Sequence, residues 1–426
     1  MIMSILQRYT ALRDYVAKNF SSTTVEMVDH ALRFADEHLS EYERYDHTPM
    51  LDHGVGVAHI VIKDIGLGRN SAIASIIHDV VRIAIQQSQP TNELFNAIRH
   101  DYGEEVLGIV LALCKISDIK LKVSKEQASD FRDMIVSYSE DPRVILIKLA
   151  DRLEVMRSLD IFPEAKRRTK SWESLNLYAQ IAHKLGLYAI KSELEDLSLK
   201  YLETEAYNHI VHELKESEKE RMAFIEEFLK PIRELLDRDG LKYHIKSRTK
   251  SVYSIFQKMR KQKVSFKGVY DIFALRIIID CPVEREKALC WTVYSHVASL
   301  YTPNPERMRD WISIPKSNGY ESLHTTVSAG GGKWVEVQIR TERMDEVAER
   351  GIAAHWRYKG VKQGGMGAEE WLQRLREMLE DTTSESIAHR FSERPTTNEI
   401  FVFTPSGDIR KLPEGATVLD FAFDIH

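Results

Sequence analysis

Apolar residues recur every three or four positions from the start of the chain to about residue 200, a spacing that predicts helices. Three of these helices are so apolar that their polar residues stand out: His53 in the first, His78 and Asp79 in the second, and Asp151 in the third. A buried histidine or aspartate is costly unless it is hydrogen-bonded or bound to a metal. These residues are therefore either ordinary hydrogen-bonded core side chains or nitrogen and oxygen ligands that three helices bring together around a divalent metal.

From about residue 240 the spacing becomes that of an α/β domain. We expect, in order, a strand over 241–248, a basic amphipathic helix over 251–263, a long strand over 269–280 and a helix over 284–301. A hairpin completes this domain, with arms at 323–327 and 333–341 joined by a glycine-rich turn.

The second arm of the hairpin alternates strictly between apolar and polar residues. Its apolar positions would face the core, so that Glu336, Gln338 and Arg340 share the opposite face. This face is either an ordinary solvated side of a sheet or a row of functional groups for binding.

Basic residues gather around the first predicted strand and helix of this domain: Arg248, Lys250, Lys258, Lys261 and Lys263. Such a cluster suits a polyphosphate. Asp271 lies in an otherwise apolar strand and needs a partner, and Glu336 would complete a pair of carboxylates for Mg²⁺. The pattern favours a nucleotide-dependent transferase. The alternative is a basic surface helix beside a sheet with ordinary edge charges.

The composition fits a globular protein of roughly two to four domains, with 426 residues, 43% of them hydrophobic and 29% charged. No run of about 18 apolar residues exists, and the first residues are too polar for a signal peptide, so we expect a cytoplasmic protein without a membrane contact. The three cysteines have no metal-ligand spacing. A net charge of −5 argues against extensive coating of nucleic acid.

The first 165 residues resemble the HD phosphohydrolase domain of the Rel/SpoT alarmone enzymes, on the basis of His53, the His78-Asp79 pair and the segment 148–153. Arg44 falls where that family has a substrate-binding arginine. The resemblance implies that a Mn²⁺ ion, which activates water against a 3′-pyrophosphate, is held by His53, His78, Asp79 and Asp151.

This domain departs from the family's hydrolases at positions that matter for chemistry. Arg82 and Ile83 replace a Glu-Asp pair one helical turn beyond the metal ligands, and neither can relay a proton at neutral pH. Glu154-Val155 replaces a His-Asn pair whose asparagine is expected to contact the nucleotide, and Gly54 replaces a proline. We therefore expect a domain that keeps its ligands and has lost hydrolysis, with a bifunctional enzyme as the alternative.

The α/β domain resembles the (p)ppGpp synthetase domain of the same family, whose motifs occur in order at 248–255, 270–277, 318–326, 336–341 and 351–356. The resemblance implies in-line attack of the 3′-hydroxyl of GDP or GTP on the β-phosphorus of ATP, which transfers pyrophosphate and releases AMP. Asp271 and Glu336 would hold Mg²⁺, with Glu336 also the base. The ATP site would comprise Arg248, Lys250, Lys258 and Arg276. The GDP or GTP site would comprise Lys316, Asn318, Tyr320, His324, Gln338 and Arg340, with Tyr320 stacked on guanine.

Two further features bear on the resemblance. The segment 307–310 is similar to a basic Arg-x-Lys-Asp motif that accompanies bifunctional members, which keeps hydrolysis open. The segment 398–426 resembles the opening of a TGS domain, and we expect the chain to be a piece of a longer protein because proteins rarely stop inside a packed unit. In the family the region beyond it senses the ribosome and uncharged tRNA.

The expected fold is a multidomain α+β protein with these limits: an all-α HD-type domain over 1–165, a helical connector over 166–238, a mixed-sheet, nucleotidyltransferase-like synthetase domain over 239–362, a helix and linker over 363–397, and a partial β-grasp-like TGS domain over 398–426. The leading interpretation is a (p)ppGpp synthetase. A non-catalytic adaptor for ribosome or tRNA is the alternative of a different class. The oligomeric state and the choice between GDP and GTP stay open.

Overall fold

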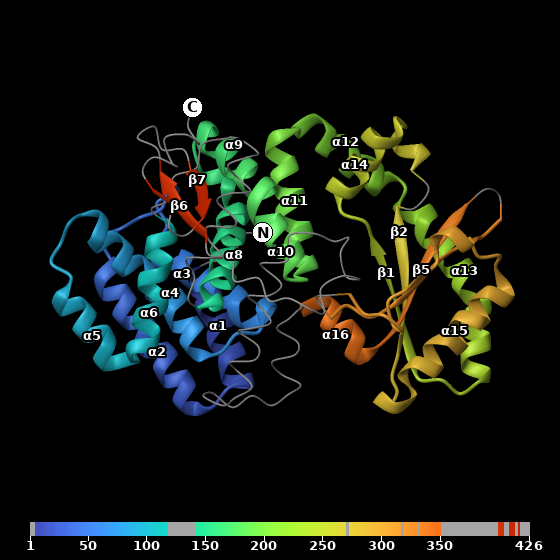
Figure 1. Cartoon of the computed structure of the whole chain (residues 1–426), viewed down its shortest axis with the longest axis horizontal. Coiled ribbons are helices and arrows are strands. Elements are labelled where there is room, and N and C mark those ends of the chain that lie inside the picture. The colour runs from blue at the N-terminus through green and yellow to red at the C-terminus, as the bar shows by residue number, and fades with distance from the viewer. Residues whose placement is uncertain are drawn as a thin grey trace. The chain divides into compact units, whose positions relative to one another are not determined.

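The computed structural model describes residues 5–117, 141–269, 272–316, 319–330, 333–350, 399–403, 409–413 and 416–417. The chain divides into two compact units (Figure 1). We call Met1–Ile181 the helical unit, with which Val361–His426 is grouped, and Ala182–Gly360 the sheet unit.

The described residues up to Ile181 are mostly helical. The bounds of the helices are α1 Ile5–Asn19, α2 Ser22–Leu39, α3 Leu51–His59, a π-helix Ile60–Ile65, α4 Arg69–Gln86, α5 Asn92–Tyr102, α6 Glu104–Ser117, α8 Pro142–Arg157, a 3₁₀-helix Leu159–Ile161, α9 Glu164–Glu173, a π-helix Ser174–Tyr178 and α10 Ala179–Lys184.

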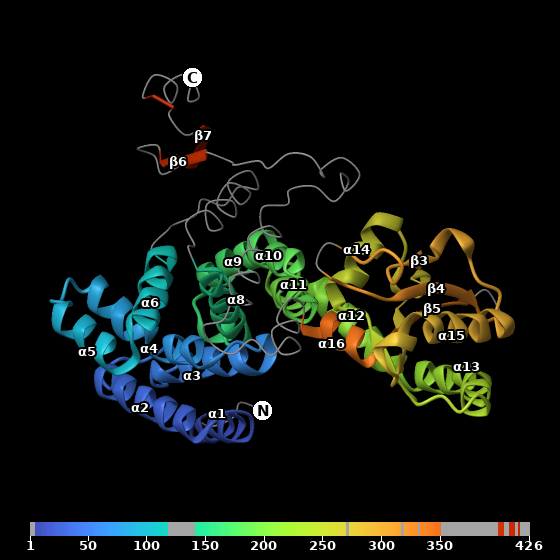
Figure 2. The same ribbon diagram turned by 60° about the horizontal axis from the view of Figure 1, so that its bottom comes forward.

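Helix α4 is the centre of the helical unit (Figure 2). It packs against α2, α3 and α6, and its residues 71–81 are buried without a break. A helix that is apolar on every side is stable only when other helices surround it. The three apolar helices predicted from the sequence are α3, α4 and α8, and α3 contacts both of the others, which confirms the helical HD-type fold.

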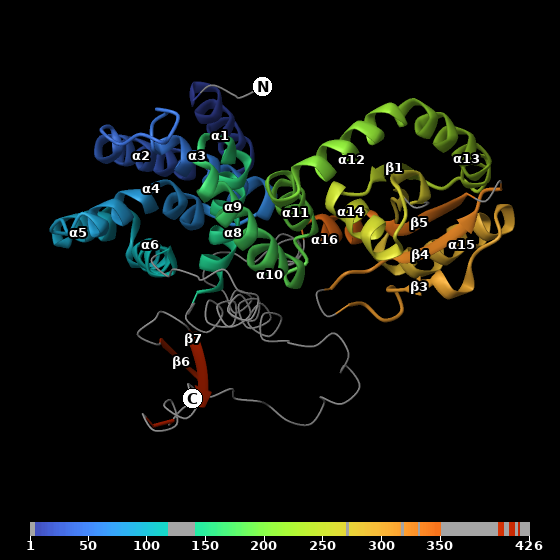
Figure 3. The same cartoon turned by 90° about the horizontal axis from the view of Figure 1, so that it is seen from above.

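The sheet unit combines helices with a five-stranded sheet (Figure 3). Its helices are α11 Tyr188–Leu202, α12 Thr204–Glu216, α13 Glu218–Arg238, α14 Val252–Gln262, α15 Glu286–Leu300 and α16 Glu342–Arg350, with 3₁₀-helices at Phe266–Gly268, Val283–Arg285 and Pro305–Arg307. Its strands are β1 Tyr243–Thr249, β2 Phe273–Ile279, β3 Arg309–Asp310, β4 Leu323–Ser328 and β5 Trp334–Thr341.

The strand order is β1-β2-β5-β4-β3. Strands β2 and β5 are parallel, and the other neighbouring pairs are antiparallel, so the sheet is mixed as predicted. The predicted hairpin is β4 and β5, with Val327 opposite Val335. The observed strand is shorter than the predicted one over 269–280, because β2 begins at Phe273 and ends at Ile279.

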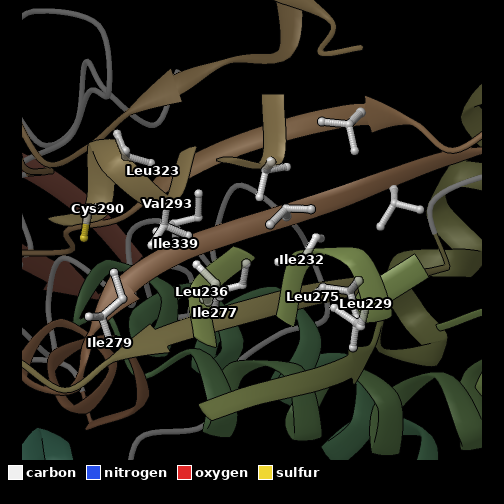
Figure 4. Packing of buried hydrophobic residues seen from close by; sticks show 14 of the residues in the cluster. Leu229, Ile232, Leu236, Leu275, Ile277, Ile279, Cys290, Val293, Leu323 and Ile339 are labelled. Carbon is white, nitrogen blue, oxygen red and sulfur yellow. The ribbon is translucent and has the colours of Figure 1, made fainter. Parts of the chain in front are cut away.

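One face of the sheet forms the core of this unit (Figure 4). Alternate residues of β2 and β5, together with Leu323 and Val327 of β4, are buried against α13 and α15. The contributing side chains include Leu229, Ile232, Leu236, Leu275, Ile277, Ile279, Cys290, Val293, Leu323 and Ile339. Burying such a side chain contributes about 1.5–3 kcal/mol, so this apolar face fixes the register of the strands.

Near the end of the chain, β6 Glu399–Phe403 pairs antiparallel with β7 Ile409–Pro413, as expected for the first hairpin of a TGS domain. The predicted helix and linker over 363–397 and most of the predicted TGS segment lie outside the described residues. Among the described helices, none combines the length and apolar character needed to cross a membrane.

Candidate functional site

The second face of the sheet carries an unbroken polar row across all five strands. Register pairs Lys246 with Arg276, Arg276 with Gln338, Gln338 with His324, and His324 with Arg309. Side chains that share a register line and a face are neighbours. Residues from β1 to β3, far apart in the sequence, therefore form one surface rich in positive charge.

Glu336 lies in the adjoining row, in register with Ala274 of β2 and Thr326 of β4. Its Oε2 is 3.2 Å from Nζ of Lys250, and its Oε1 accepts a hydrogen bond of 2.8 Å from Gln338. Burial would raise the pKa of Glu336, but Lys250 and Gln338 lower it below the usual value, so the side chain is an ionised carboxylate at neutral pH.

A cavity of about 380 Å³ opens beside Glu336, and its lining combines one carboxylate with four cationic side chains. The lining residues are Lys250, Lys258, Gln262, Arg307, Arg309, His324, Thr326 and Glu336. The sequence assigned four of them to a nucleotide site. It did not assign Gln262 and Thr326, and it gave Arg307 and Arg309 no contact role. For Thr326 the signal was its register opposite Glu336; for the arginines it was the basic motif.

Tyr320 lies beside this cavity among further polar groups. Its hydroxyl is hydrogen-bonded to His324 Nε2 at 2.6 Å, and Nζ of Lys316 lies 5.1 Å from the centre of its ring. The guanidinium of Arg340 is 6.0 Å from the same ring. Tyr320 is only 8% exposed, and burial raises the pKa of its hydroxyl and lowers that of Lys316.

His324 gives a direct pH prediction. Burial lowers its pKa from 6.5 to about 4, although nearby Glu336 acts in the opposite direction. We therefore expect a neutral imidazole that shows no titration between about pH 5.5 and 8. The carbon-bound proton signals of this histidine, assigned in NMR spectra by comparison with a His324→Gln variant, should not shift over that range. A midpoint near 6.5 would contradict the prediction.

Two arginines of the polar face are paired with the helix that follows β5. Arg276 is ion-paired with Glu349 of α16 and donates a 3.3 Å hydrogen bond to Gln338. Arg340 Nε is 3.1 Å from Asp345, and the side chain is fully buried. The terminal nitrogens of Arg340 have no hydrogen-bond partner within the described part of the chain. Arg248 does not line the cavity. Its pKa is lowered mainly by burial and, to a smaller extent, by the positive charge of Arg276.

The helical unit holds a second polar group, which we call the histidine cluster: His53, His78, Asp79 and Asp151. One ligand atom each from His53, His78 and Asp151 lie within 4.8 Å of one another. His78 Nδ1 contacts the Ser75 carbonyl at 2.7 Å, which turns its Nε2 toward the other members. Such convergence of ring nitrogens and carboxylate oxygens is typical of a divalent-metal site.

The carboxylates of the histidine cluster are also bound by cations. Arg82 Nε donates to Asp79 Oδ1 at 2.6 Å, and Lys148 is ion-paired with Asp151. Burial would raise the pKa of Asp79, but His78 and Arg82 lower it, so the side chain stays ionised. Its second oxygen, Oδ2, is buried without a hydrogen-bond partner among the described residues.

Arg44 is part of an ion-pair network next to the histidine cluster. Its Nη1 lies 3.1 Å from Asp52 and 3.3 Å from Glu154, and its Nη2 is 2.5 Å from the Ser158 hydroxyl. The side chain is 7% exposed. The structure therefore places the predicted substrate arginine in internal contacts.

Three family models match successive parts of the chain. An HD domain model matches residues 31–188, the region found in RelA / SpoT proteins matches 247–363, and a TGS domain model matches 400–426. This order of domains, with homologues that align over most of the chain, decides the family. The chain belongs to the Rel/SpoT family.

Several curated Rel/SpoT proteins are similar to this chain. The guanosine-3′,5′-bis(diphosphate) 3′-pyrophosphohydrolase of Aquifex aeolicus is 38% identical over 94% of this chain and 56% of its own. The GTP pyrophosphokinase of Myxococcus xanthus is 38% identical over 89% and 49%. The bifunctional (p)ppGpp synthase/hydrolase SpoT of Escherichia coli is 37% identical over 89% and 53%. The chain spans about half the length of the curated relatives it matches.

Two residues that the Rel/SpoT resemblance assigns to the synthetase site, Asp271 and Asn318, lie outside the described residues. Of the others, Lys250, Lys258, His324 and Glu336 meet at the cavity. Lys316, Tyr320 and Arg340 form the aromatic group beside it. The individual roles and the domain limits given above stay predictions.

Proposed function

We propose that this Rel/SpoT protein is a (p)ppGpp synthetase, which transfers the β,γ-pyrophosphate of ATP to the 3′-hydroxyl of GDP or GTP and releases AMP. The observation that carries the proposal is the ionised Glu336 at a cavity lined by Lys250, Lys258, Arg307 and Arg309. Phosphoryl transfer needs positioned cations and a group that accepts the hydroxyl proton, and this cavity provides both.

The positions of the remaining side chains support two adjacent nucleotide subsites. Lys250 and Lys258 at the cavity, with Arg248 and Arg276 on the neighbouring strands, would bind the phosphates of ATP. Tyr320 offers its ring to guanine, with Lys316 and His324 beside it. The buried terminal nitrogens of Arg340 are costly without a partner, and a bound guanine nucleotide would supply acceptors for them. Gln338 joins the two subsites through its contacts with Arg276 and Glu336.

A divalent cation fits this site, because Glu336 supplies an ionised carboxylate and Mg²⁺ prefers oxygen ligands. Glu336 and Asp271 would hold the ion, which neutralises charge on the transferred pyrophosphate. The histidine cluster likewise fits Mn²⁺, since its ligand atoms converge and Asp79 Oδ2 is buried without a described partner. His53, His78, Asp79 and Asp151 would hold that ion.

We further propose that the HD domain binds metal without hydrolysing alarmone. Arg82 stands where hydrolases of the family have an acid, and its guanidinium donates a hydrogen bond to Asp79. A guanidinium cannot accept a proton at neutral pH. The second candidate is a bifunctional enzyme, favoured by the convergence of the histidine cluster and by relatives named as hydrolases. An adaptor without catalysis does not account for the charged cavity. The TGS match supports the ribosome and uncharged tRNA as partners of the longer protein.

Chromatography of two reactions tests these proposals. In the first, the protein is mixed with ATP, GDP or GTP and Mg²⁺, and AMP and alarmone should appear together in equal amounts. In the second, ppGpp is mixed with Mn²⁺ and no ATP, and no pyrophosphate should be released. Absence of AMP in the first reaction would contradict the synthetase proposal, and pyrophosphate in the second would establish the bifunctional alternative.

Replacing Tyr320 with alanine should raise the KM for GDP by about 5- to 150-fold, since base–aromatic stacking contributes roughly 1–3 kcal/mol. The KM for ATP should change much less, because the predicted ATP contacts lie on other side chains. Tyr320→Phe is the matched control, since it keeps the ring and removes the hydroxyl that is hydrogen-bonded to His324. Steady-state rates of AMP formation give both constants. Equal increases for ATP and GDP would contradict guanine stacking.

A further inference from the structure

Glu154 connects the histidine cluster with the arginine network next to it. Its side chain is 4% exposed and lies on α8, one turn beyond Asp151. Its Oε2 contacts His53 Nδ1, while its Oε1 lies 3.3 Å from Arg44 and 3.4 Å from Arg8. One carboxylate thus contacts a candidate metal ligand and two arginines at once.

The contact with His53 determines which ring nitrogen faces the cluster. With Nδ1 held by Glu154, Nε2 lies 3.2 Å from Asp151. A carboxylate that accepts the outer N–H of a histidine fixes the tautomer and the ring orientation needed for metal ligation. Glu154 therefore does for His53 what the Ser75 carbonyl does for His78.

The contacts with Arg44 and Arg8 have a different consequence. The same arginine nitrogens also lie 3.1 and 3.2 Å from Asp52, so two guanidinium groups are shared between two buried carboxylates. An arginine satisfied in this way by internal carboxylates is not available to the phosphates of a nucleotide. A buried carboxylate also repels an incoming anion.

Room for Glu154 is provided by Gly56 on α3. A Cβ atom at position 56 would lie 2.8 Å from Cγ of Glu154 and 3.4 Å from Arg8 Nη1. Such a separation is shorter than atoms tolerate, so a side chain at position 56 would displace the carboxylate. The helix packing of the unit is thus adapted to this buried acid.

We propose that Glu154 is a positioning residue that sets what the histidine cluster binds: it orients His53 for a divalent metal and, as an internal counter-anion for Arg44, excludes the alarmone. The second part rests on the proposed loss of hydrolysis. Glu154 stands where hydrolases of the family have a histidine, which could not play the role of a counter-anion. The histidine cluster thereby becomes a metal site without a nucleotide site.

Calorimetric titration of the whole chain with Mn²⁺ alone tests whether Glu154 orients His53 for metal binding. Glu154→Ala should raise the Kd for Mn²⁺ by about 10- to 100-fold, the usual effect of removing such a partner. Glu154→Gln should recover most of the affinity, because its amide oxygen still accepts from Nδ1, and it remains informative if the alanine variant fails to fold. Asp52→Asn is the matched control: it contacts both arginines but not His53, and should leave the Kd within about threefold. This role of Glu154 would be contradicted if the wild type bound no Mn²⁺, or if Glu154→Ala and Asp52→Asn lost equal affinity for Mn²⁺.

Titration with ppGpp in the presence of Mn²⁺ tests exclusion. The wild type should bind ppGpp at the synthetase site alone, and Glu154→Gln should show a second, Mn²⁺-dependent site that disappears when His78→Ala is added. Two outcomes would contradict the exclusion of ppGpp by Glu154. One is a second ppGpp site in the wild type with the affinity seen in Glu154→Gln, and the other is the absence of a second site in Glu154→Gln. AMP formation from ATP and GDP is measured in parallel. If AMP forms normally, either of these outcomes counts against exclusion by Glu154 and not against the synthetase proposal.

Discussion

Replacing Glu336 with glutamine will lower the rate of pyrophosphate transfer by about 10²- to 10⁴-fold, the range that a positioned general base contributes. Glutamine keeps the size of the side chain and its contact with Gln338, but it cannot take the proton of the 3′-hydroxyl or supply a charged oxygen to Mg²⁺. The ionised state of Glu336, maintained by Lys250 at 3.2 Å, is what makes the side chain suitable for both tasks. AMP formation from ATP and GDP at saturating concentrations gives the rate.

The matched control for this experiment is Glu226→Gln. Glu226 lies on α13, which packs on the apolar face of the sheet, and it forms an exposed 2.7 Å pair with Arg233. Exposed pairs of this kind contribute about 0–1 kcal/mol to stability, so the control should keep its activity. If both variants retained wild-type turnover, Glu336 would not be the base, and the polar face would have to act through other groups.

In the Glu154→Gln background, the combined substitution Arg82→Glu and Ile83→Asp should create Mn²⁺-dependent release of pyrophosphate from ppGpp, at least about 10²-fold above the Glu154→Gln chain. Arg82 neutralises the charge of Asp79 through a 2.6 Å hydrogen bond, and its guanidinium cannot relay a proton. An acid pair one turn beyond His78 and Asp79 would supply that function. With Glu154 retained, the two acids should add little hydrolysis, because Arg44 then stays paired with the Glu154 carboxylate.

Ile83→Asp by itself is the control for the combined substitution, since it introduces an acid and leaves Arg82 on Asp79. It should add little hydrolysis. Thermal unfolding of each variant, followed by circular dichroism, separates a loss of structure from a lack of catalysis. A wild-type chain that already hydrolyses ppGpp with Mn²⁺, and gains nothing from the two acids, would show that Arg82 is no obstacle and would favour the bifunctional enzyme.

The predicted helices and strands were largely confirmed because hydrophobic spacing is a local property. The helices α3, α4 and α8 and the hairpin of β4 and β5 occur where the periodicity placed them. The start of β2 was predicted too early, since Val269 is as apolar as the strand itself but follows a 3₁₀-helix. Spacing cannot distinguish a strand residue from a buried apolar residue that precedes the strand.

Candidate site residues were found from the sequence, but their relation to one another was not. Alternation placed Glu336, Gln338 and Arg340 on one face, and the structure buries Arg340 completely beside Asp345 and Tyr320. A helix that covers one end of a sheet leaves no trace in the period of the strand beneath it. The contact of Arg309 with the same polar row depends on register across four strand pairs.

The sequence by itself determined the fold class, the order of the domains and the types of chemical group available, because periodicity and motif residues are properties of short segments. Tertiary structure decided which charges neutralise each other. Glu154 looked like the loss of a family residue, and only the packing of α8 against α3 showed that its carboxylate contacts both His53 and Arg44. Electrostatic interactions depend on distance and burial, and both are set by residues more than a hundred positions apart in the chain.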